Sequence, residues 1–563
     1  MNSLIDFKKF KLKYLHILVI ALGSVFISLS VFHTSLWFDE SYSVGLANHS
    51  FGDIWIIGGN DVHPILYYYF LHFLNLIFGN NVIVYRLFSV LCTTLLGVIG
   101  FTHIRKDFGE KVGVFFSFLV FFLPANLIYA GEIRMYSLAM LLVTLTGIYA
   151  YRIYKNSGLF GREMLAPTHN NTNGNLNIKN WIIFAICSLA SAYTHYYALM
   201  ASGLINLILF ISLILQCVNK HKCKNISYDA KSKDNLPMHS NKILLKHNMS
   251  LEYKNMIAFT VSAIVQIILY IPWLLRLFAQ MGHVSNGFWI SVSFPGTFIE
   301  LFNFILTGDS PYIGSAFSIV FGLIVIVYMI ILYVNKNGFA MFKPTLHGSF
   351  TNKLKVSASK IINMQPANFA IALFLGIALV ASIMSFVWTP ILFPRYMLCV
   401  MGFFIFFFSY IIVKKGFKHM NLFLCTVYLF ICLAININLI NINYDENNNK
   451  PLDFVKESIK DNDIILNNNE ITGFNISVNF PKNTTYFYDE EYWNCGEAYK
   501  ALSHDFYTVH DLDFLDGFSG RVWLTNDKLL QQLNEKYDIK VIEHEAFETS
   551  YKGDTYSLYL IEL

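Results

Sequence analysis

Charged residues are scarce in this chain. Asp, Glu, Lys and Arg make up only 14% of the 563 residues, whereas 55% are hydrophobic and 52 are Phe. A soluble protein of this length could hardly bury so much apolar surface, so the composition predicts that the bilayer is the solvent for most of the chain. The formal net charge of +4 is small and lies in patches, which argues against nucleic acid as a partner.

Cysteine and internal repetition are also sparse. The eight cysteines lie mostly in apolar runs, and only Cys495 is in a clearly polar region, so no disulfide framework is expected. We find no internal repeat, which weakens an interpretation as a transporter built from duplicated halves. The first apolar run is about 20 residues long and ends in "FHTSLWF" without a small-residue cleavage site, which predicts an uncleaved first span.

Apolar runs long enough to cross a bilayer recur along residues 1–442. We expect about eleven spans in this transmembrane part, with an error of one or two, and a separate C-terminal part over 443–563. The runs begin near Tyr14, Arg86, Val112, Met135, Trp181, Leu199, Met256, Ala316, Asn368, Tyr396 and Leu422. The segment "HPILYYYFLHFLNLIFG" from His63 fits either a further span or an aromatic helix at the interface.

The distribution of Lys and Arg decides between those two interpretations. With the His63 segment at the interface, the basic stretches fall on one face, among them 8–13, 220–254 and 336–360. The opposite face receives residues 33–85 and 279–315, neither of which contains Lys or Arg. The positive-inside rule then predicts a multi-pass plasma-membrane protein whose N-terminus is cytoplasmic and whose first loop, 33–85, and C-terminal part lie outside.

The composition becomes polar after an Asn-rich linker, "NINYDENNNK". Strand-like runs such as "DIILN", "RVWLT" and "TYSLYLIEL" then alternate with helical patterns such as "NDKLLQQLNEK". This alternation predicts a small extracytoplasmic α/β domain over 443–563.

Several polar side chains, whose placement in or near a membrane costs free energy, lie at the same membrane depth in this topology. They come from separate stretches: Asp39, Glu40, Asp61, His63, Arg86, Glu132, Arg134, His195 and Arg395. Such charges are candidate functional groups. A carboxylate can take the proton of an acceptor hydroxyl, an arginine can bind phosphate through two nitrogens, and aromatic rings can stack on a sugar. The set therefore suits group transfer from a lipid phosphate, with Asp39 as base and Arg134 and Arg395 on the phosphate. The run from Tyr67 to Tyr69 could bind the sugar.

Six motifs, ordered along residues 10–410, carry a family resemblance. They are "WFDESYS", "DVHPILYYYFLHF", "GEIRMYSL", "THYYAL", "IPWL" and "PRYML". In this order they resemble the GT-C membrane glycosyltransferases, in the branch of the protein O-mannosyltransferases and the lipid A aminoarabinose transferase. The resemblance implies a GT-C fold and transfer of a sugar, such as the hexose mannose, from a polyprenyl- or dolichyl-phosphate donor with inversion. The acceptor hydroxyl would belong to a protein, a lipid or a glycan.

The resemblance also implies roles for particular residues. Asp39 matches the catalytic base, and Glu40 would position the acceptor or help a metal. The remaining roles are donor phosphate binding by Arg134, Tyr136, Arg395 and Tyr396, and substrate binding by His63, Tyr67, Glu132 and His195. The sequence identifies no cofactor with certainty, and a divalent cation, Mg or Mn, held by Asp39, Glu40 and His63 stays an open option. One departure from the family pattern is Ile65, where relatives often have a second proline.

Structural explanations compete with these roles. A carboxylate pair can cap a helix, an arginine can anchor a span at the interface, and a histidine can be a packed polar residue or end a loop. These explanations apply to Asp39 and Glu40, to Arg134 and Arg395, and to His195 and His63. Glu132 could pair with Arg134 and do nothing else, and Arg86 could be structural.

Two other functional classes also compete with the enzyme. A transporter or flippase of lipid-linked glycans predicts charges deep within several spans, whereas the charges here cluster at one mouth. A non-catalytic scaffold would present its C-terminal part as a binding module. Deleting 443–563 should abolish all function of a scaffold, while an enzyme could retain some.

Overall fold

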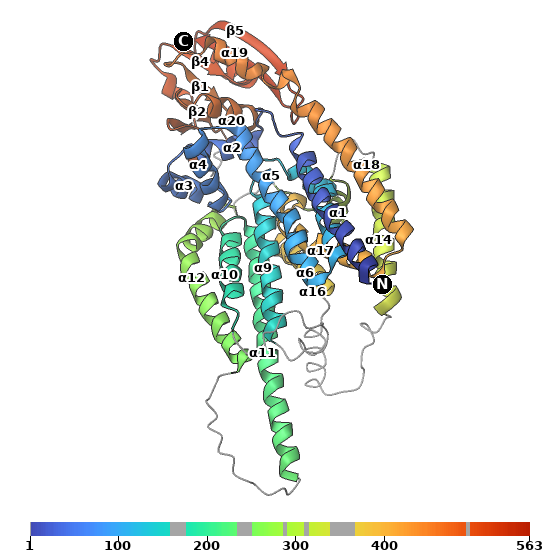
Figure 1. The fold of residues 1–563 in the computed structure, drawn as a ribbon. Helices are drawn as coiled ribbons and strands as arrows, with labels where there is room; N and C mark the ends of the chain where they lie inside the picture. The colour runs from blue at the N-terminus through green and yellow to red at the C-terminus, as the bar shows by residue number, and fades with distance from the viewer. Residues whose placement is uncertain are drawn as a thin grey trace.

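The chain folds into a bundle of helices that carries a small α/β domain at one end (Figure 1). The computed structural model describes residues 2–157, 176–233, 250–284, 290–308, 315–337, 366–490 and 496–563. The predicted fold class, a helical polytopic protein followed by a small α/β domain, is confirmed. Much of the basic face predicted from the sequence, at 234–249 and 338–360, lies outside the described residues.

Eight of the described helices are long and apolar enough to cross a membrane. They lie in α1 (Asn2–Ser28), α5 (Val82–Ile99) continued through η2 (Gly100–Ile104) and α6 (Arg105–Phe108), α9 (Tyr136–Ser157), α11 (Tyr196–Lys233), α12 (Leu251–Val284), α16 (Pro366–Val387), η5 (Pro394–Val400) with α17 (Met401–Lys415), and α18 (Lys418–Asn443). All eleven predicted runs form helices. Two of them, α7 (Glu110–Phe122) and α10 (Ile178–Ala192), are shorter than a full span, whereas α14 (Ser315–Asn337) has 23 residues.

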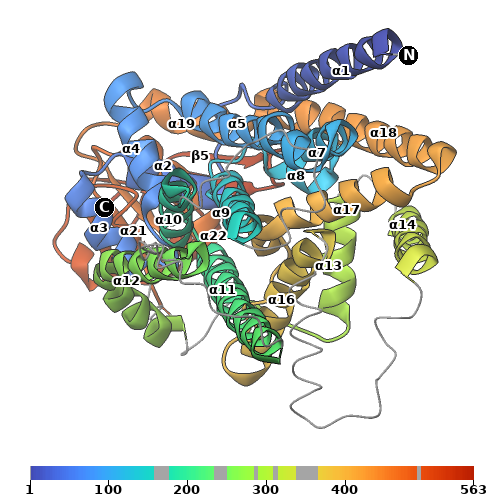
Figure 2. The same ribbon diagram turned by 60° about the horizontal axis from the view of Figure 1, so that its bottom comes forward.

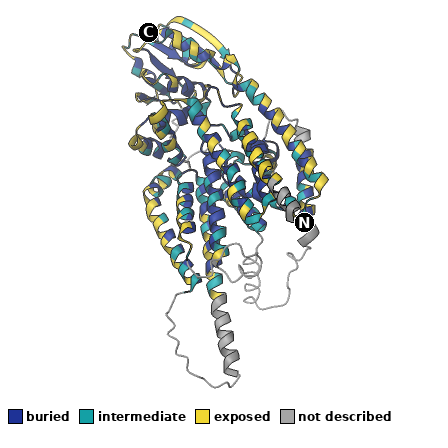
Figure 3. Ribbon diagram, in the orientation of Figure 1, coloured by how far each residue is buried: buried dark blue, intermediate teal, exposed yellow. Residues whose placement is uncertain are grey.

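Burial distinguishes inner helices from those on the outside of the bundle. In α9 and in η5 with α17, 78% and 83% of the most apolar window is buried, compared with 17% in α1 and in α12. The exposed residues of α1, α12 and α18 are largely apolar, which suits contact with lipid (Figures 2 and 3). The inner position of α9 and η5 matters because each begins next to the polar residues at one end of the bundle.

The segment from His63 forms α4 (Leu66–Phe78), a helix of 13 residues. At 1.5 Å per residue it is about 20 Å long, too short for a hydrocarbon core of about 30 Å. Its length therefore fits the interface interpretation. It packs against α2 (Phe38–Ala47) and α3 (Phe51–Ile57), beside the C-terminal domain, toward which α1 also runs (Figure 1). The remaining short helices of this part are η1 (Gly58–Asn60), α8 (Pro124–Tyr129) and α13 (Gly296–Thr307).

The C-terminal domain is a six-stranded mixed sheet in the order β3-β2-β1-β4-β6-β5. Its strands are β1 (Ile464–Asn467), β2 (Thr485–Tyr488), β3 (Phe506–Val509), β4 (Arg521–Leu524), β5 (Lys540–Glu548) and β6 (Thr555–Glu562). The first four are parallel, and β6 and β5 are added antiparallel. Its helices are η6 (Glu446–Asn448), α19 (Lys450–Ser458), α20 (Glu470–Asn479), α21 (Gly496–Tyr499), η7 (Asp513–Leu515) and α22 (Asp527–Asn534).

Helices cover both faces of this sheet. Successive residues of β1 alternate between two cores, so Leu466 packs with Leu529 of α22, whereas Ile465 packs with Val455 of α19 and Ile476 of α20. The α/β prediction is correct, although the sequence patterns did not indicate β3 or α20.

The domain docks directly onto the helix that carries the acidic pair. Phe38 of α2 stacks on Phe474 of α20, with ring centroids 5.4 Å apart. Gly45 allows the close approach, because a Cβ there would lie 2.5 Å from the backbone oxygen of Ala501. The acidic pair therefore lies between the bundle and the C-terminal domain.

Candidate active site

Asp39 and Glu40 occupy the first turn of α2, and both are buried. Their negative charges suit the positive end of the helix dipole. However, the N-cap residue is Trp37, so neither acid occupies that position, and the two carboxylates bind arginines from other helices. Helix capping alone therefore does not account for this acidic pair.

Glu40 is enclosed in a buried ion pair. Arg86 of α5 donates from Nη1 to Oε1 at 2.6 Å and from Nη2 to Oε2 at 2.8 Å. The backbone N–H of Ile133 and the hydroxyl of Tyr551 also donate to this carboxylate, each at 2.9 Å. The geometry does not support the predicted catalytic or metal-binding role for Glu40, because its oxygens are occupied by these donors. The structural explanation for Arg86 fits its position.

Asp39 faces two other arginines. Its Oδ2 lies 3.2 Å from Nη1 of Arg395 and 3.8 Å from Nε of Arg134. Burial by itself raises the pKa of Asp39, but the positive charges of Arg134 and Arg395 more than offset this effect, so the pKa lies below its ordinary value. Asp39 is therefore ionised at neutral pH, as a general base must be.

The two arginines differ in their surroundings. Nη1 of Arg134 donates to the backbone oxygen of Asp39 at 3.2 Å and to Oγ of Ser43 at 3.3 Å, and its side chain is 3% exposed. Arg395, at the start of η5, is 14% exposed and lines a cavity. Arg134 thus holds α2 in place, whereas Arg395 can reach a ligand.

An aromatic and histidine cluster adjoins this ion pair. The ring of His195 lies 5.1 Å from that of Tyr396 and 5.7 Å from those of Tyr136 and His63. Its Nδ1 accepts the backbone N–H of Tyr197, so a neutral ring carries its proton on Nε2. The buried Nε2 has no partner among the described residues. His63 lies 3.3 Å from Asp61, measured from Nδ1 to Oδ2.

Tyr67 does not present a face to a ligand. Its side chain is fully buried, and its hydroxyl lies 3.0 Å from Oγ of Ser89. Its ring packs against Tyr68 and Phe88. The predicted sugar contact by Tyr67 is at odds with this position, because the helical turn of α4 points Tyr67 into the core.

Glu132 pairs with a residue from the C-terminal domain and not with Arg134. Nζ of Lys552 lies 3.0 Å from Oε1 of Glu132, and the carboxylate is buried. Lys552 and Tyr551 were not found from the sequence. The only local signal is "YKGD", which is typical of a tight turn and says nothing about an ion pair.

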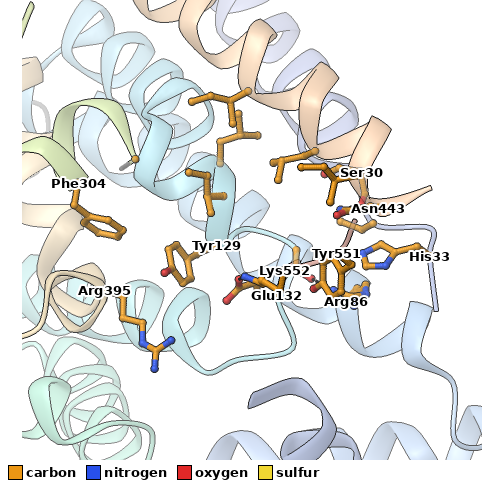
Figure 4. A pocket seen from close by; sticks show the side chains of 18 of the residues that line it. Ser30, His33, Arg86, Tyr129, Glu132, Phe304, Arg395, Asn443, Tyr551 and Lys552 are labelled. Atoms are coloured by element: carbon orange, nitrogen blue, oxygen red, sulfur yellow. Dashed lines mark hydrogen bonds and ion pairs between the residues drawn. The ribbon is translucent and has the colours of Figure 1, made fainter. Parts of the chain in front are cut away.

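A cavity of about 640 Å³ opens beside these residues. Its polar side includes Arg395, Glu132 and Lys552, and its apolar side includes Phe304 and Leu439. In Figure 4, Lys552 and Glu132 lie between Arg395 on one side and Tyr551 with Arg86 on the other. A site with an apolar wall and cations at one end suits an amphiphilic anion.

The open option of a metal ion is not supported by these positions. Among the described residues, no group of three or more His, Cys, Asp or Glu could hold a metal ion. Glu40 faces Arg86, and His63 faces Asp61. Because these two side chains face other partners, the proposed ligands do not fit a divalent cation.

No family model and no curated protein matches the chain. Among solved structures, it is similar to ArnT from Cupriavidus metallidurans in the apo state, with 11% identity, 97% of both chains covered and a TM-score of 0.48. For ArnT bound to undecaprenyl phosphate, the identity is 10%, 97% of both chains is covered and the TM-score is 0.42. It is also similar to the oligosaccharyltransferase AglB from Archaeoglobus fulgidus in complex with an inhibitory peptide and a dolichol-phosphate. That comparison gives 12% identity, a TM-score of 0.38, and coverage of 88% of this chain and 64% of AglB.

Proposed function

We propose that this protein is a membrane glycosyltransferase that moves a sugar from a polyprenyl- or dolichyl-phosphate donor to an acceptor hydroxyl. The observation that carries the proposal is the contact between Asp39 and Arg395, 3.2 Å from Oδ2 to Nη1. Arg395 also lines the cavity, so it connects the buried Asp39, the proposed base, to a site with an apolar wall. The donor is an apolar chain that ends in an anion, which matches both sides of that cavity.

The reaction follows from these positions. The donor phosphate binds Arg395 and draws it away from Asp39, which frees an ionised carboxylate. Asp39 takes the proton of the acceptor hydroxyl while the acceptor oxygen forms a bond to the anomeric carbon. The bond from that carbon to the phosphate oxygen breaks, and its electron pair leaves with the lipid phosphate. Attack from the face opposite the phosphate inverts the anomeric carbon.

The positions of the cations support an anionic donor. Arg86 and Arg134 are paired inside the protein, whereas Arg395 and Lys552 line the cavity, together with the carboxylates Glu132 and Glu300. His33, which also lines the cavity, adds no charge, because burial and then the nearby charges of Arg86 and Lys552 lower its pKa to about 2. When Asp39 takes the proton of the acceptor, one negative charge is lost beside Arg395, which favours the released phosphomonoester with its charge of about −2.

The sugar, the acceptor and the orientation in the membrane belong to the same proposal. We propose a hexose such as mannose, an acceptor on a protein, lipid or glycan, and a reaction on the outer face of the plasma membrane. We also propose residues 443–563 as a separate domain on that face. Contacts of His63, His195, Tyr136 and Tyr396 with the sugar or phosphate remain predictions.

The test is transfer by the purified full-length protein. It is incubated with a panel of polyprenyl- and dolichyl-phosphate sugars, and release of the carrier phosphate is followed by mass spectrometry. We expect release with at least one donor when a hydroxyl acceptor is present. If no donor is consumed and polyprenyl phosphate does not bind, the proposal is wrong.

A further inference from the structure

Lys552 has an unusual backbone conformation. It lies in the loop between β5 and β6, and its φ of 60° is the only positive φ of a non-glycine residue among those described. This left-handed conformation favours glycine and costs free energy for a lysine. Gly553, with a φ of 71°, follows directly. A glycine would suit position 552 too, so the lysine side chain has to be explained by what it contacts.

The side chain of Lys552 reaches from the C-terminal domain into the cavity beside Arg395. Its Nζ lies 3.0 Å from Oε1 of Glu132 and 4.2 Å from the centre of the Trp37 ring. The guanidinium carbon of Arg395 lies 5.7 Å from the centre of the same ring. Both cations therefore lie within cation–π distance of the Trp37 ring, and Figure 4 shows Lys552 between Arg395 and Tyr551.

Lys552 also adds the second positive charge of the cavity wall. Arg86 is neutralised by Glu40, and Asp39 lies against Arg134 and Arg395. Without Lys552, Arg395 would be the one arginine or lysine of the cavity lining that is not held by Glu40, and Glu132 would lose its cationic partner. An ammonium has three N–H donors, and the one described ion pair of Lys552 is with Glu132. Further donors can therefore reach a phosphate.

We propose that Lys552, supplied by the β5–β6 loop of the C-terminal domain, binds the donor phosphate together with Arg395. The donor site is then incomplete in the transmembrane part alone, and the C-terminal domain is a part of the catalytic centre. This inference rests on the proposed function, because it names a further phosphate ligand for the same donor.

The alternative is that the ion pair between Lys552 and Glu132 only fastens the domain to the bundle. The two explanations predict different signs for two variants. If Lys552 binds phosphate, Lys552→Met weakens binding of the anion, whereas Glu132→Gln removes a nearby negative charge and strengthens it. If the ion pair is only a fastener, both variants lose the same contact and change binding in the same direction.

The experiment measures binding of a polyprenyl monophosphate to the full-length protein in lipid nanodiscs, with the uncharged polyprenol as reference. We expect Lys552→Met to weaken binding of the phosphate about ten- to a hundredfold, the usual range for a hydrogen bond to a charged group, without changing binding of the polyprenol. Lys552→Arg should restore most of the affinity. Lys540→Met is the matched control, because Lys540 is an exposed lysine of β5 that pairs with Glu562.

Lys552→Gly keeps the test decisive if the methionine variant does not fold, because glycine adopts the left-handed backbone without strain. It should stay folded, as monodisperse protein in detergent, and lose affinity for the phosphate. The inference is overturned if the folded variants bind polyprenyl phosphate as the wild type does, or if Glu132→Gln weakens binding as Lys552→Met does. If the wild type itself does not bind polyprenyl phosphate, the proposed function fails and this inference fails with it.

Discussion

Arg86 holds both carboxylate oxygens of Glu40, at 2.6 and 2.8 Å, in a site where neither side chain is more than 2% exposed. The adjacent carboxylate, Asp39, instead contacts Arg395, which lines the cavity. The two neighbouring acids therefore have different surroundings. Glu40 fastens α2 to α5 and to the C-terminal domain, whereas Asp39 is the proposed base.

Loss of one partner of the buried pair should destabilise the protein. Glu40→Gln or Arg86→Met leaves an uncompensated charge or polar group, which costs about 3–5 kcal/mol. We expect lower thermal stability in detergent, measured by the loss of monodisperse protein on heating. The double variant Glu40→Leu/Arg86→Met should recover part of this loss. Equal stability of the single variants and the wild type would contradict the anchoring role.

Asp39→Asn should abolish transfer while the protein stays folded. Removal of a general base lowers the rate about 10²- to 10⁴-fold. The measurement is the turnover rate with a saturating donor, together with binding of polyprenyl phosphate, which should persist. Asp53→Asn is a matched control, because Asp53 is an exposed acid of α3 that bonds to Ser50. Near-normal turnover of the Asp39→Asn variant would rule out Asp39 as the base.

The two arginines at Asp39 should respond differently to substitution by lysine. Arg395→Lys should raise the KM for the donor about tenfold, because a lysine cannot bind phosphate through two nitrogens. Arg134→Lys should mainly lower kcat, because Arg134 positions α2 through Ser43 and the backbone of Asp39. Initial rates over a range of donor concentrations separate the two effects. The same change in KM for both variants would contradict this division of tasks.

The pH dependence of the base follows from its neighbours. The pKa of Asp39 is raised by burial but lowered further by Arg134 and Arg395, so it lies below the ordinary 3.8. The ion pairs therefore stabilise the fold above the ordinary pKa, and this contribution is lost as the pH falls through the lowered pKa. For the same reason, titration of Asp39 should not reduce kcat/KM between pH 7 and about pH 5. Arg134→Gln should raise the pKa of Asp39 and move the acid limb of the pH profile upward.

The sequence could predict that Arg134 and Arg395 lie near Asp39, because the predicted topology places all three residues on the same side of the membrane and at the same depth. Arg134 precedes α9 and Arg395 lies in the first turn of η5, both at the ends predicted to lie on the face without basic loops, and both do lie against Asp39. The same reasoning could not tell Asp39 from Glu40. Their separate tasks depend on the direction of each side chain from the first turn of α2, which is set by packing against α5 and the C-terminal domain.

The contacts of the C-terminal domain were beyond sequence reasoning for a different reason. Lys552 and Glu132 are separated by 420 residues, and nothing in a lysine within a turn indicates its partner. The deletion of 443–563 also becomes a weaker test of whether the protein is a scaffold or an enzyme. That deletion removes Tyr551, one of the donors to Glu40, and Lys552, the partner of Glu132, so an enzyme should lose its activity too. The point variants above are the sharper test.

The hydrogen bond from Tyr551 to Glu40 joins two residues 511 positions apart. The surroundings of this buried glutamate are therefore completed only after the loop between β5 and β6 has been synthesised and has docked against α2. A product that stopped before Tyr551 would lack this donor to Glu40.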